Sequence, residues 1–508
     1  MTSPAKGAQR APADTSARLA SRRVCGGCGA VVPSDAAFVP TCPNAADGGD
    51  HVLLRELDES DLRFGFGGDP AFPDEPFLRW RHRLHAWHQA TLAGWSDAAL
   101  IDLVLRLDRA IATVDGHGFR VTPLHAAPAL AGALGLAGPL WVKDDTHNVS
   151  GSHKARHLFG ILLALEIADR APDGARHPNH GAARPLAIAS CGNAALAAAV
   201  LARAAERRLQ VFIPPDAAAP VVARLSALGT EIVVCDRASG ELGDPCVTRF
   251  RAAVAAGALP FACQGPENGL AIEGGETLGW ELVTQLDAEA RRHGAPRALD
   301  RVFVQVGGGA LGSAVGRALQ QALAAGAIAR LPRLHAVQTV GAWPLARAYE
   351  RLARRLDGNP SGPSELDHSP DAVAFRTRRA DRLATAFASG PLLQTELTRA
   401  ARDRAELMWP WETPPTSVAH GILDDETYDW LALTRAMLQS GGFPIVVDES
   451  TLVRANALAR AHTAIDADET GTAGLAGLVA LAASGTLDPR EATAVFFTGA
   501  RRHASTGG

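Results

Sequence analysis

Short apolar runs alternate with longer stretches of helical periodicity along most of the chain. The short runs predict β-strands at residues 139–145, 185–190, 209–215, 230–236, 301–306 and 334–341. Residues 155–168 and the alanine-rich residues 194–205 predict buried helices. Strands that alternate with helices in this way are typical of a parallel, doubly wound α/β architecture.

Two regions lack this alternation. Residues 62–138 have a helical pattern and several tryptophans, whereas residues 351–404 are polar and include a predicted loop or linker at 357–371. With 508 residues the chain is too long for one ordinary hydrophobic core, so two or three domains are expected.

Composition and charge argue against several classes of protein. Apolar residues make up 47% of the chain and charged residues 20%, as in ordinary globular proteins. The net charge of −4 gives no support for nucleic-acid binding. Every long apolar run is interrupted by charges or helix breakers, so no membrane helix is expected.

Residues 1–23 consist mostly of alanine, serine, arginine and proline. They contain no apolar core segment, which argues against a secretory signal; a disordered tail is expected, and their arginines leave a transit peptide open. The seven cysteines are an odd number without the spacing of a disulfide framework, which favours a reducing cytoplasm.

A candidate metal site begins with Cys25 and Cys28, a CxxC pair that can bind one Zn²⁺ from a single turn. Cys42 follows, and His51 would complete a Cys3His set in a zinc-ribbon-like segment at residues 24–60. The second half of the site is short of a cysteine. A degenerate ribbon that kept its turn but lost its metal, or a surface pair of thiols, therefore stays open.

Lysine is almost absent from the chain. Of the 50 basic residues only Lys6, Lys143 and Lys154 are lysines, and the other 47 are arginines. A lysine amine can form a Schiff base with an aldehyde, which arginine cannot. Lys154 follows a Gly-Ser loop and begins an apolar helix, a position where phosphate groups also bind. Lys154 is therefore the candidate nucleophile, whereas Lys6 is expected at the surface and Lys143 in a structural role.

A candidate phosphate site lies at residues 305–313, QVGGGALGS, between a predicted strand and a predicted helix. Backbone N–H groups in such a loop converge on a phosphate. Gly307, Gly309 and Gly312 also match the dinucleotide-binding pattern, but the next strand lacks the acidic residue that this pattern requires. We therefore favour a phosphate site over an NAD site, with close helix packing as the structural alternative.

A third stretch, Ser190, Cys191, Gly192 and Asn193, joins a predicted strand to the alanine-rich helix. Small polar groups at a helix N-terminus suit a carboxylate. The same residues would also make an ordinary N-cap. This stretch therefore indicates a function only in combination with the others.

Four motifs in this order, NVSGSHKARH, SCGN, VGGGALGS and FFTGA, resemble the fold-type-II pyridoxal-phosphate enzymes. That family includes threonine synthase, serine/threonine dehydratase and the tryptophan synthase β subunit. The resemblance covers residues 122–499, and the CxxC segment is similar to the ribbon that precedes some threonine synthases. It implies two doubly wound parallel-sheet domains: a large cofactor-binding domain from residues 61–155 and 266–508, and a small mobile domain from residues 156–265.

The resemblance also implies a role for each motif. Lys154 would form the Schiff base and move the proton at Cα, and His153 would shape the contacts with the cofactor. Asn193 would bind the cofactor's ring hydroxyl. The residues expected around the substrate carboxylate are Ser190, Cys191, Gly192 and Asn193. The residues expected to bind the phosphate through their backbone are Gly307, Gly308, Gly309, Ala310 and Leu311.

Thr498 would face the pyridine nitrogen of the cofactor. A carboxylate in that position keeps the nitrogen protonated and makes the ring a strong electron sink, whereas a neutral hydroxyl does not. The resemblance therefore favours β-elimination or β-replacement over transamination.

Departures from the family pattern leave the substrate open. His153 stands where threonine synthases and dehydratases usually have phenylalanine, which is closer to tryptophan synthase β. Ala155 follows the lysine where threonine synthases have aspartate, and Arg156 would be available to a phosphorylated substrate. Cys191 replaces the commoner serine or threonine.

The sequence thus predicts a pyridoxal-phosphate-dependent lyase or β-replacement synthase for a small L-amino acid, in the cytoplasm. The resemblance alone implies a homodimer. The alternatives are threonine synthase acting on O-phosphohomoserine, a catalytically silent cofactor-binding scaffold or regulatory protein, and an NAD-dependent oxidoreductase. The last predicts no visible chromophore from the cofactor.

Overall fold

The computed structural model describes residues 21–33, 38–170, 184–238, 241, 243–294, 298–358, 362–364, 366–367, 369–387 and 390–502. Most of the expected disordered tail lies outside these residues. Its last three residues belong to the first strand, which begins at Ser21.

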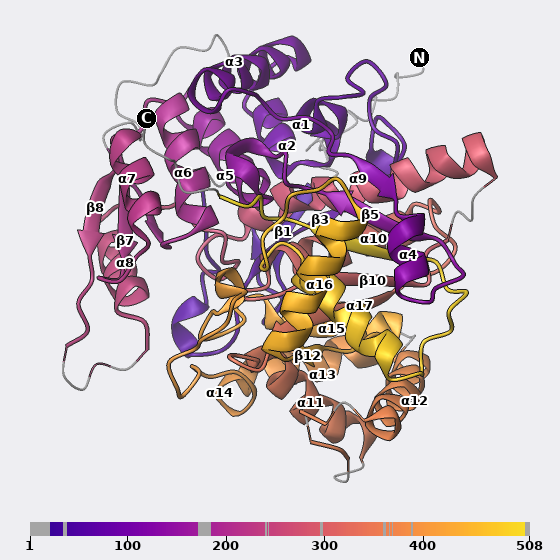
Figure 1. Cartoon of the computed structure of the whole chain (residues 1–508). Helices are drawn as coiled ribbons and strands as arrows, with labels where there is room; N and C mark the ends of the chain where they lie inside the picture. The colour runs from indigo at the N-terminus through magenta and orange to yellow at the C-terminus, as the bar shows by residue number, and fades with distance from the viewer. Residues whose placement is uncertain are drawn as a thin grey trace, which may run out of the picture.

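Three β-sheets organise the chain (Figure 1). The first is antiparallel, in the order β2-β1-β3, and contains β1 Ser21–Cys25, β2 Val31–Val32 and β3 Leu53–Leu57. The second has the order β12-β11-β10-β13-β5-β4 and contains β4 Leu124–Ala126, β5 Leu140–Asp144, β10 Arg301–Gln305, β11 Arg333–Thr339, β12 Ile445–Val447 and β13 Thr493–Phe497. The third has the order β8-β7-β6-β9 and contains β6 Leu186–Ala189, β7 Leu209–Ile213, β8 Glu231–Val234 and β9 Leu259–Pro260.

The two larger sheets are parallel except for β4, which pairs antiparallel with β5. Every residue of β5, β10 and β13 is buried. Strands that are covered on both faces appear in a sequence as continuous apolar runs. All six strands that the sequence predicts are therefore present, and the predicted α/β class is confirmed.

Helices connect the strands and cover the sheets. The helices that precede the third sheet in the chain are α1 Pro76–Arg79, α2 His85–Leu92, α3 Asp97–Asp115, α4 Pro128–Ala133 and α5 Lys154–Ala168. Those around the third sheet are α6 Asn193–Ala204, α7 Ala219–Ala227 and α8 Pro245–Ala255, which lie at the left of Figure 1. Those that follow are α9 Leu270–His293, α10 Ala310–Ala324, α11 Pro344–Asp357, α12 Pro370–Ala386, α13 Gly390–Arg402, α14 Arg404–Leu407, α15 Trp430–Ser440, α16 Glu449–His462 and α17 Ala473–Ala483.

The polar stretch 351–404 contains α12 and α13, two helices that are not predicted from the sequence. Within the described part of the chain, the helices include none that is both long enough and apolar enough to cross a membrane. The division into a large and a small domain and the homodimer both stay predictions.

Candidate active site

Three loops meet at the carboxyl ends of β5, β13 and β10, which are neighbours in the six-stranded sheet. The loop after β5 leads to Lys154, β13 ends next to Thr498, and β10 leads into the glycine loop 307–309. Ligands of parallel α/β sheets bind at this edge. The fold thus brings three of the predicted motifs together.

Direct contacts hold the lysine loop against the end of β13. Ser152 and Gly499 form an antiparallel bridge, and the Ala500 N–H donates to the Gly151 carbonyl at 3.0 Å. These contacts bring the segment before Lys154 next to the segment that carries Thr498, although the two are far apart in sequence.

Lys154 is the first residue of α5 and is half-buried. Among the residues that the structure describes, none forms a hydrogen bond or ion pair with its amine. His153 and His157 lie beside it with their rings edge to face, 5.6 Å between centroids. Burial, together with the Lys154 charge, lowers the pKa of His153 well below its usual value and that of His157 to about 3. Both imidazoles are therefore neutral near pH 7, which leaves the lysine as the basic group at this point.

The glycine loop has the geometry of an anion site. Gly309 has φ 99°, which only glycine adopts readily, and α10 begins at the next residue. The carbonyls of Gly307 and Gly308 accept hydrogen bonds from the Thr427 hydroxyl at 2.9 Å and the Asp429 N–H at 3.0 Å. These contacts fix the peptide planes of the loop. Ser313, in the first turn of α10, has a buried hydroxyl with no partner among the described residues.

Asp424 places a carboxyl oxygen at this loop. Its carboxylate accepts a hydrogen bond from the Gly308 N–H, and burial raises the pKa of the carboxyl although the Lys154 charge opposes the shift. A Cβ on Gly307 would lie 2.2 Å from Asp424 Oδ2, so only glycine fits there. The Gly308 N–H therefore points at a side-chain oxygen, as an N–H group of a phosphate loop would point at a phosphate. No sequence motif singles out Asp424.

The third sheet contributes Ser190, Cys191, Gly192 and Asn193 from the end of β6 and the start of α6. The Asn193 carboxamide oxygen accepts a hydrogen bond from Arg502 at 2.7 Å. Its NH₂ group is therefore left to donate, as the predicted contact with a ring hydroxyl requires. Cys191 is exposed. Arg502, which also donates to the Ser150 carbonyl at 3.0 Å, is a second residue that the motifs miss.

Thr498 is buried at the end of β13, and its hydroxyl accepts a hydrogen bond from the side-chain amide of Gln305. Gln305 is the last residue of β10, directly before the glycine loop. The structure thus connects the predicted ring-nitrogen partner to a glutamine that lies within the predicted phosphate motif and has no role assigned from the sequence.

Arg156 lies inside the protein. It is fully buried, and its guanidinium donates to Glu281 at 2.7 Å, Asn148 at 2.8 Å and Thr277 at 3.0 Å. The Glu281 carboxylate also binds the Lys143 amine at 2.6 Å. The expectation that Arg156 is available to a phosphorylated substrate is therefore wrong, because the structure commits this cation to an internal ion cluster.

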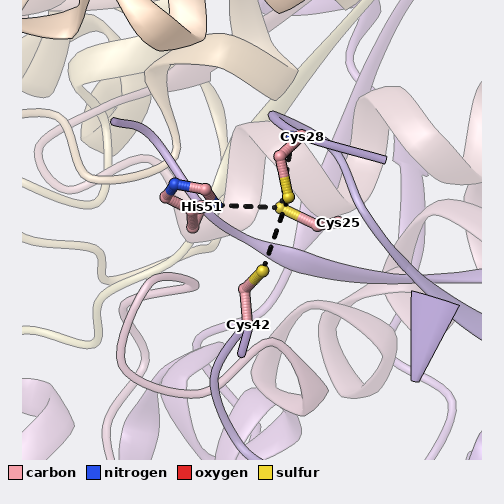
Figure 2. A group of neighbouring side chains, drawn as sticks. All are labelled: Cys25, Cys28, Cys42 and His51. Atoms are coloured by element: carbon pink, nitrogen blue, oxygen red, sulfur yellow. Dashed lines mark hydrogen bonds between the residues drawn. The ribbon is translucent and has the colours of Figure 1, made fainter. Parts of the chain in front are cut away.

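A separate cluster lies at the N-terminal sheet (Figure 2). The ligand atoms of Cys25, Cys28, Cys42 and His51 all lie within 4.8 Å of one another. The Cys28 and Cys42 sulfurs are 3.6 Å apart, and the Cys25 sulfur is 3.5 Å from His51 Nδ1. The edge of a tetrahedron around Zn²⁺ with sulfur ligands is ~3.8 Å, so the four atoms have the spacing of such a site.

The second ring nitrogen of His51 also has a partner. His51 Nε2 lies 2.7 Å from the Asp47 carboxylate. A carboxylate on the second nitrogen orients a histidine ligand and increases its basicity. Asp47 is a further residue that is not predicted from the sequence, and it completes the usual surroundings of a metal-binding imidazole.

Comparisons with known proteins identify the family and the fold. A family model described as "Pyridoxal-phosphate dependent enzyme" matches residues 117–391, more than half of the chain. A threonine synthase from Synechocystis sp. is 28% identical over 247 residues, which are 47% of this chain and 57% of that protein. The match thus spans little more than half the length of this relative.

Solved structures show the same fold. Diaminopropionate ammonia lyase from Escherichia coli aligns with a TM-score of 0.52 and 16% identity over 80% of this chain and 89% of the other. Maize serine racemase aligns with a TM-score of 0.51 and 17% identity over 79% of this chain and 94% of the other. At these identities the likeness supports the fold alone.

Proposed function

This chain belongs to the fold-type-II family of pyridoxal-phosphate-dependent enzymes, and from that premise we propose that it is a lyase or β-replacement synthase for a small L-amino acid. When bound, the cofactor supplies an aldehyde that condenses with amines and a ring that stabilises a carbanion at the substrate Cα. The residues around the glycine loop fit its phosphate, because the Gly308 N–H already donates to a carboxyl oxygen of Asp424.

In this proposal the chain's own residues have separate roles. Lys154 would hold the cofactor through its amine and would move the proton at the substrate Cα. The backbone of residues 307–311 would hold the phosphate, and the Asn193 NH₂ group would donate to the ring hydroxyl. Ser190 and Gly192 hold the substrate carboxylate from the other sheet. Exclusion of water from the space between the two sheets would favour release of the β-substituent over side reactions.

The choice of reaction rests on one observation: the Thr498 hydroxyl lies at the end of β13, beside the lysine loop. An enzyme that uses the cofactor ring as a strong electron sink would have a carboxylate in this position. A neutral partner leaves the ring nitrogen unprotonated and the carbanion less delocalised. Expulsion of a β-substituent then competes better than transfer of the amino group.

Threonine synthase activity on O-phosphohomoserine is the second candidate. Such a substrate carries a phosphate and needs a cation in the site. Arg156 is committed to Glu281, and the observation that keeps this candidate is Arg502, whose guanidinium reaches Asn193.

The test uses the purified protein loaded with pyridoxal phosphate, together with Lys154→Ala. The visible spectrum is recorded before and after addition of serine, threonine, O-acetylserine, 2,3-diaminopropionate and O-phosphohomoserine in turn, and released ammonia, phosphate and 2-oxo acid are measured. We expect a cofactor band that the variant lacks, and release of ammonia or a 2-oxo acid from one of the first four amino acids.

The other outcomes are equally informative. Phosphate release from O-phosphohomoserine alone would replace the lyase with a threonine synthase. A band that no amino acid disturbs, with no product from any of them, would favour the silent scaffold. Absence of any band after addition of the cofactor would overturn the proposal.

We also propose that Cys25, Cys28, Cys42 and His51 bind one structural Zn²⁺. The spacing of the four ligand atoms and the carboxylate on the far side of the histidine support this proposal. The protein as purified is expected to contain about one zinc per chain, and Cys28→Ser is expected to lower both zinc content and thermal stability. Zinc-free protein with the stability of the parent after exposure to a chelator would contradict it and would favour the degenerate ribbon.

A further inference from the structure

The side chain of Gln305 makes two hydrogen bonds through one atom. Its amide nitrogen donates to the Gly471 carbonyl at 3.0 Å and to the Thr498 hydroxyl oxygen. Both Gln305 and Thr498 are buried. The amide is thus held between the end of β13 and the turn that precedes α17.

The Gly471 carbonyl decides which way the amide points. A carbonyl can only accept, so the side-chain atom that faces it must be the NH₂ group of Gln305. The same carbonyl also accepts from the Thr498 N–H at 3.2 Å, and a Cβ on Gly471 would lie 2.7 Å from the Gly499 nitrogen. The acceptor is therefore fixed in place by tight backbone packing, and the amide cannot turn over without losing this bond.

This orientation determines the role left to the Thr498 hydroxyl. Its oxygen accepts from Gln305, and within the described residues no acceptor is found for its hydrogen. Accepting a hydrogen bond polarises an O–H group, which makes it a stronger donor and a weaker acceptor. The hydrogen is thus available to the cofactor, whose pyridine nitrogen the proposed function places beside Thr498.

We infer that Gln305 is a positioning residue that turns the Thr498 hydroxyl into a donor to the cofactor's ring nitrogen, and that it thereby favours loss of the β-substituent over transfer of the amino group. This inference rests on the proposed function, because it requires pyridoxal phosphate in the site. A ring nitrogen that accepts a hydrogen bond stays unprotonated. With an acceptor in front of it, the same nitrogen binds a proton and the ring becomes the stronger electron sink.

Few charged groups surround Thr498. His153 is neutral, since burial lowers the pKa of its imidazole. The Asp468 carboxylate accepts from the Gly471 N–H at 2.6 Å, which commits it to the turn. Arg501 contacts Glu469 at 3.2 Å, and Lys154 lies on the neighbouring loop. Protonation of the ring nitrogen is therefore governed by Thr498 and by the side chain behind it.

The decisive variant is Gln305→Glu, which changes one NH₂ group into an oxygen. If the new acid is neutral, its O–H donates a hydrogen bond to the Gly471 carbonyl; if it is charged, the site holds two acceptors. In both cases the atom that faces Thr498 accepts the hydroxyl hydrogen, and the hydroxyl turns its lone pair toward the ring. Gln305→Met removes the donor without adding an acceptor. Gln321→Met, at a glutamine on α10 that binds Trp280, is the matched control.

Two readouts are compared in the loaded enzymes. The first is the visible spectrum of the bound cofactor from about pH 6 to about pH 9, without substrate. The second is the partition of one amino acid, measured as amino-transfer product formed per elimination. In amino transfer the substrate becomes a 2-oxo acid that keeps its β-substituent, and the cofactor becomes the corresponding amine. In elimination the β-substituent leaves with its bonding electron pair and the cofactor is unchanged.

For Gln305→Glu we expect protonation of the ring nitrogen to extend to higher pH, and amino transfer per elimination to rise about tenfold, which corresponds to one pKa unit. Gln305→Met should change both readouts in the same direction by less, and Gln321→Met should change neither. If both Gln305 variants bind the cofactor and keep the parent's spectrum and partition within about twofold, the inference is overturned. Absence of a cofactor band in the parent would instead overturn the proposed function, so the two failures are distinguishable.

Discussion

Lys143 and Lys154 lie eleven positions apart and have opposite surroundings. The Lys143 amine is fully buried and donates to Glu281 at 2.6 Å, the Thr122 carbonyl at 2.6 Å and Gln285 at 3.0 Å. The Lys154 amine is half-buried and, within the described residues, has no such partner. Retention of a lysine in an arginine-rich chain is therefore not in itself a sign of catalysis. An amine left without partners at a converging set of loops is the more specific sign.

The ion cluster also explains why Lys143 is a lysine. The Glu281 carboxylate binds the Lys143 ammonium through one oxygen and the Arg156 guanidinium through the other. A compact ammonium with three donors fits the three acceptors at the end of β5, whereas a second planar guanidinium would need more room. Position 143 is therefore a lysine and position 156 an arginine because the acceptors around them are arranged differently.

The largest expected effect separates the two lysines by function. Lys154→Ala should lower turnover by more than about 10³-fold, because a general base alone contributes about 10²- to 10⁴-fold and this lysine also attaches the cofactor. Its effect on the free energy of unfolding should stay within about 0.5 kcal/mol, since the amine has no partner to lose. Steady-state kinetics and thermal unfolding of the cofactor-free variant measure both. A large loss of stability would remove the contrast with Lys143.

The second effect is on stability. Lys143→Met should lower the free energy of unfolding by about 3 kcal/mol, because it leaves one oxygen of the buried Glu281 carboxylate without a cation. Denaturant unfolding gives the value. The double variant Lys143→Met with Glu281→Gln removes the charge that is left behind and should recover part of the loss. Loss of turnover in Lys143→Met at a temperature where it is folded would place this lysine in the active site after all.

A smaller effect tests to which region Arg156 belongs. Arg156→Lys keeps the charge but loses the fork that reaches Asn148, Thr277 and Glu281, and it should cost about 1–3 kcal/mol of stability. The KM values for neutral and phosphorylated amino acids should change by the same factor. A selective rise in KM for O-phosphohomoserine would show that this arginine contacts the substrate and would revive the threonine synthase candidate.

The last effect appears only as a dependence on pH and involves Asp145, which accepts from the Thr122 hydroxyl within the Lys143 region. Burial raises the pKa of its carboxyl to about 7, although the Lys143 charge opposes the shift. The folded state then holds this proton more tightly than the unfolded state, whose pKa is about 3.9, so the free energy of unfolding falls as the pH rises from about 4 to about 7.

Asp145→Asn cannot ionise and should therefore lose less stability across that range, by up to about 4 kcal/mol. Melting temperatures of the parent and the variant between about pH 5 and about pH 8 test this expectation. Asp102→Asn, at an exposed acid on α3, is the control. Parallel curves for the parent and Asp145→Asn would show that this carboxyl is already ionised in the folded protein.

Much of the fold could be predicted from the sequence because its central strands are buried on both faces and therefore form continuous apolar runs. A short strand leaves too few residues for a recognisable run, as β12 shows with three residues. The helices α12 and α13 are also missed, because charged and polar residues interrupt their apolar positions.

In the candidate site, too, some residues can be predicted from local sequence and others cannot. Lys154, Asn193, Thr498 and the glycine loop are recognisable because each lies in a local motif at the end of a strand. Gln305 lies within a recognised motif, but its contact with Thr498 depends on the pairing of β10 with β13. Asp424 and Arg502 reach the site from loops with no pattern of their own. No spacing along the chain encodes such contacts, because they arise only when distant segments approach in the folded protein.

The position of β13 has a consequence for how the protein is made. It is the last strand of the described chain to be synthesised, yet it lies between β5 and β10 in the middle of the six-stranded sheet. In a nascent chain that ends before residue 493, β10 and β5 therefore each have an unpaired edge where β13 would lie. Such edges are prone to pair with other chains. Premature termination shortly before this strand should thus yield an aggregating product rather than a weakened enzyme.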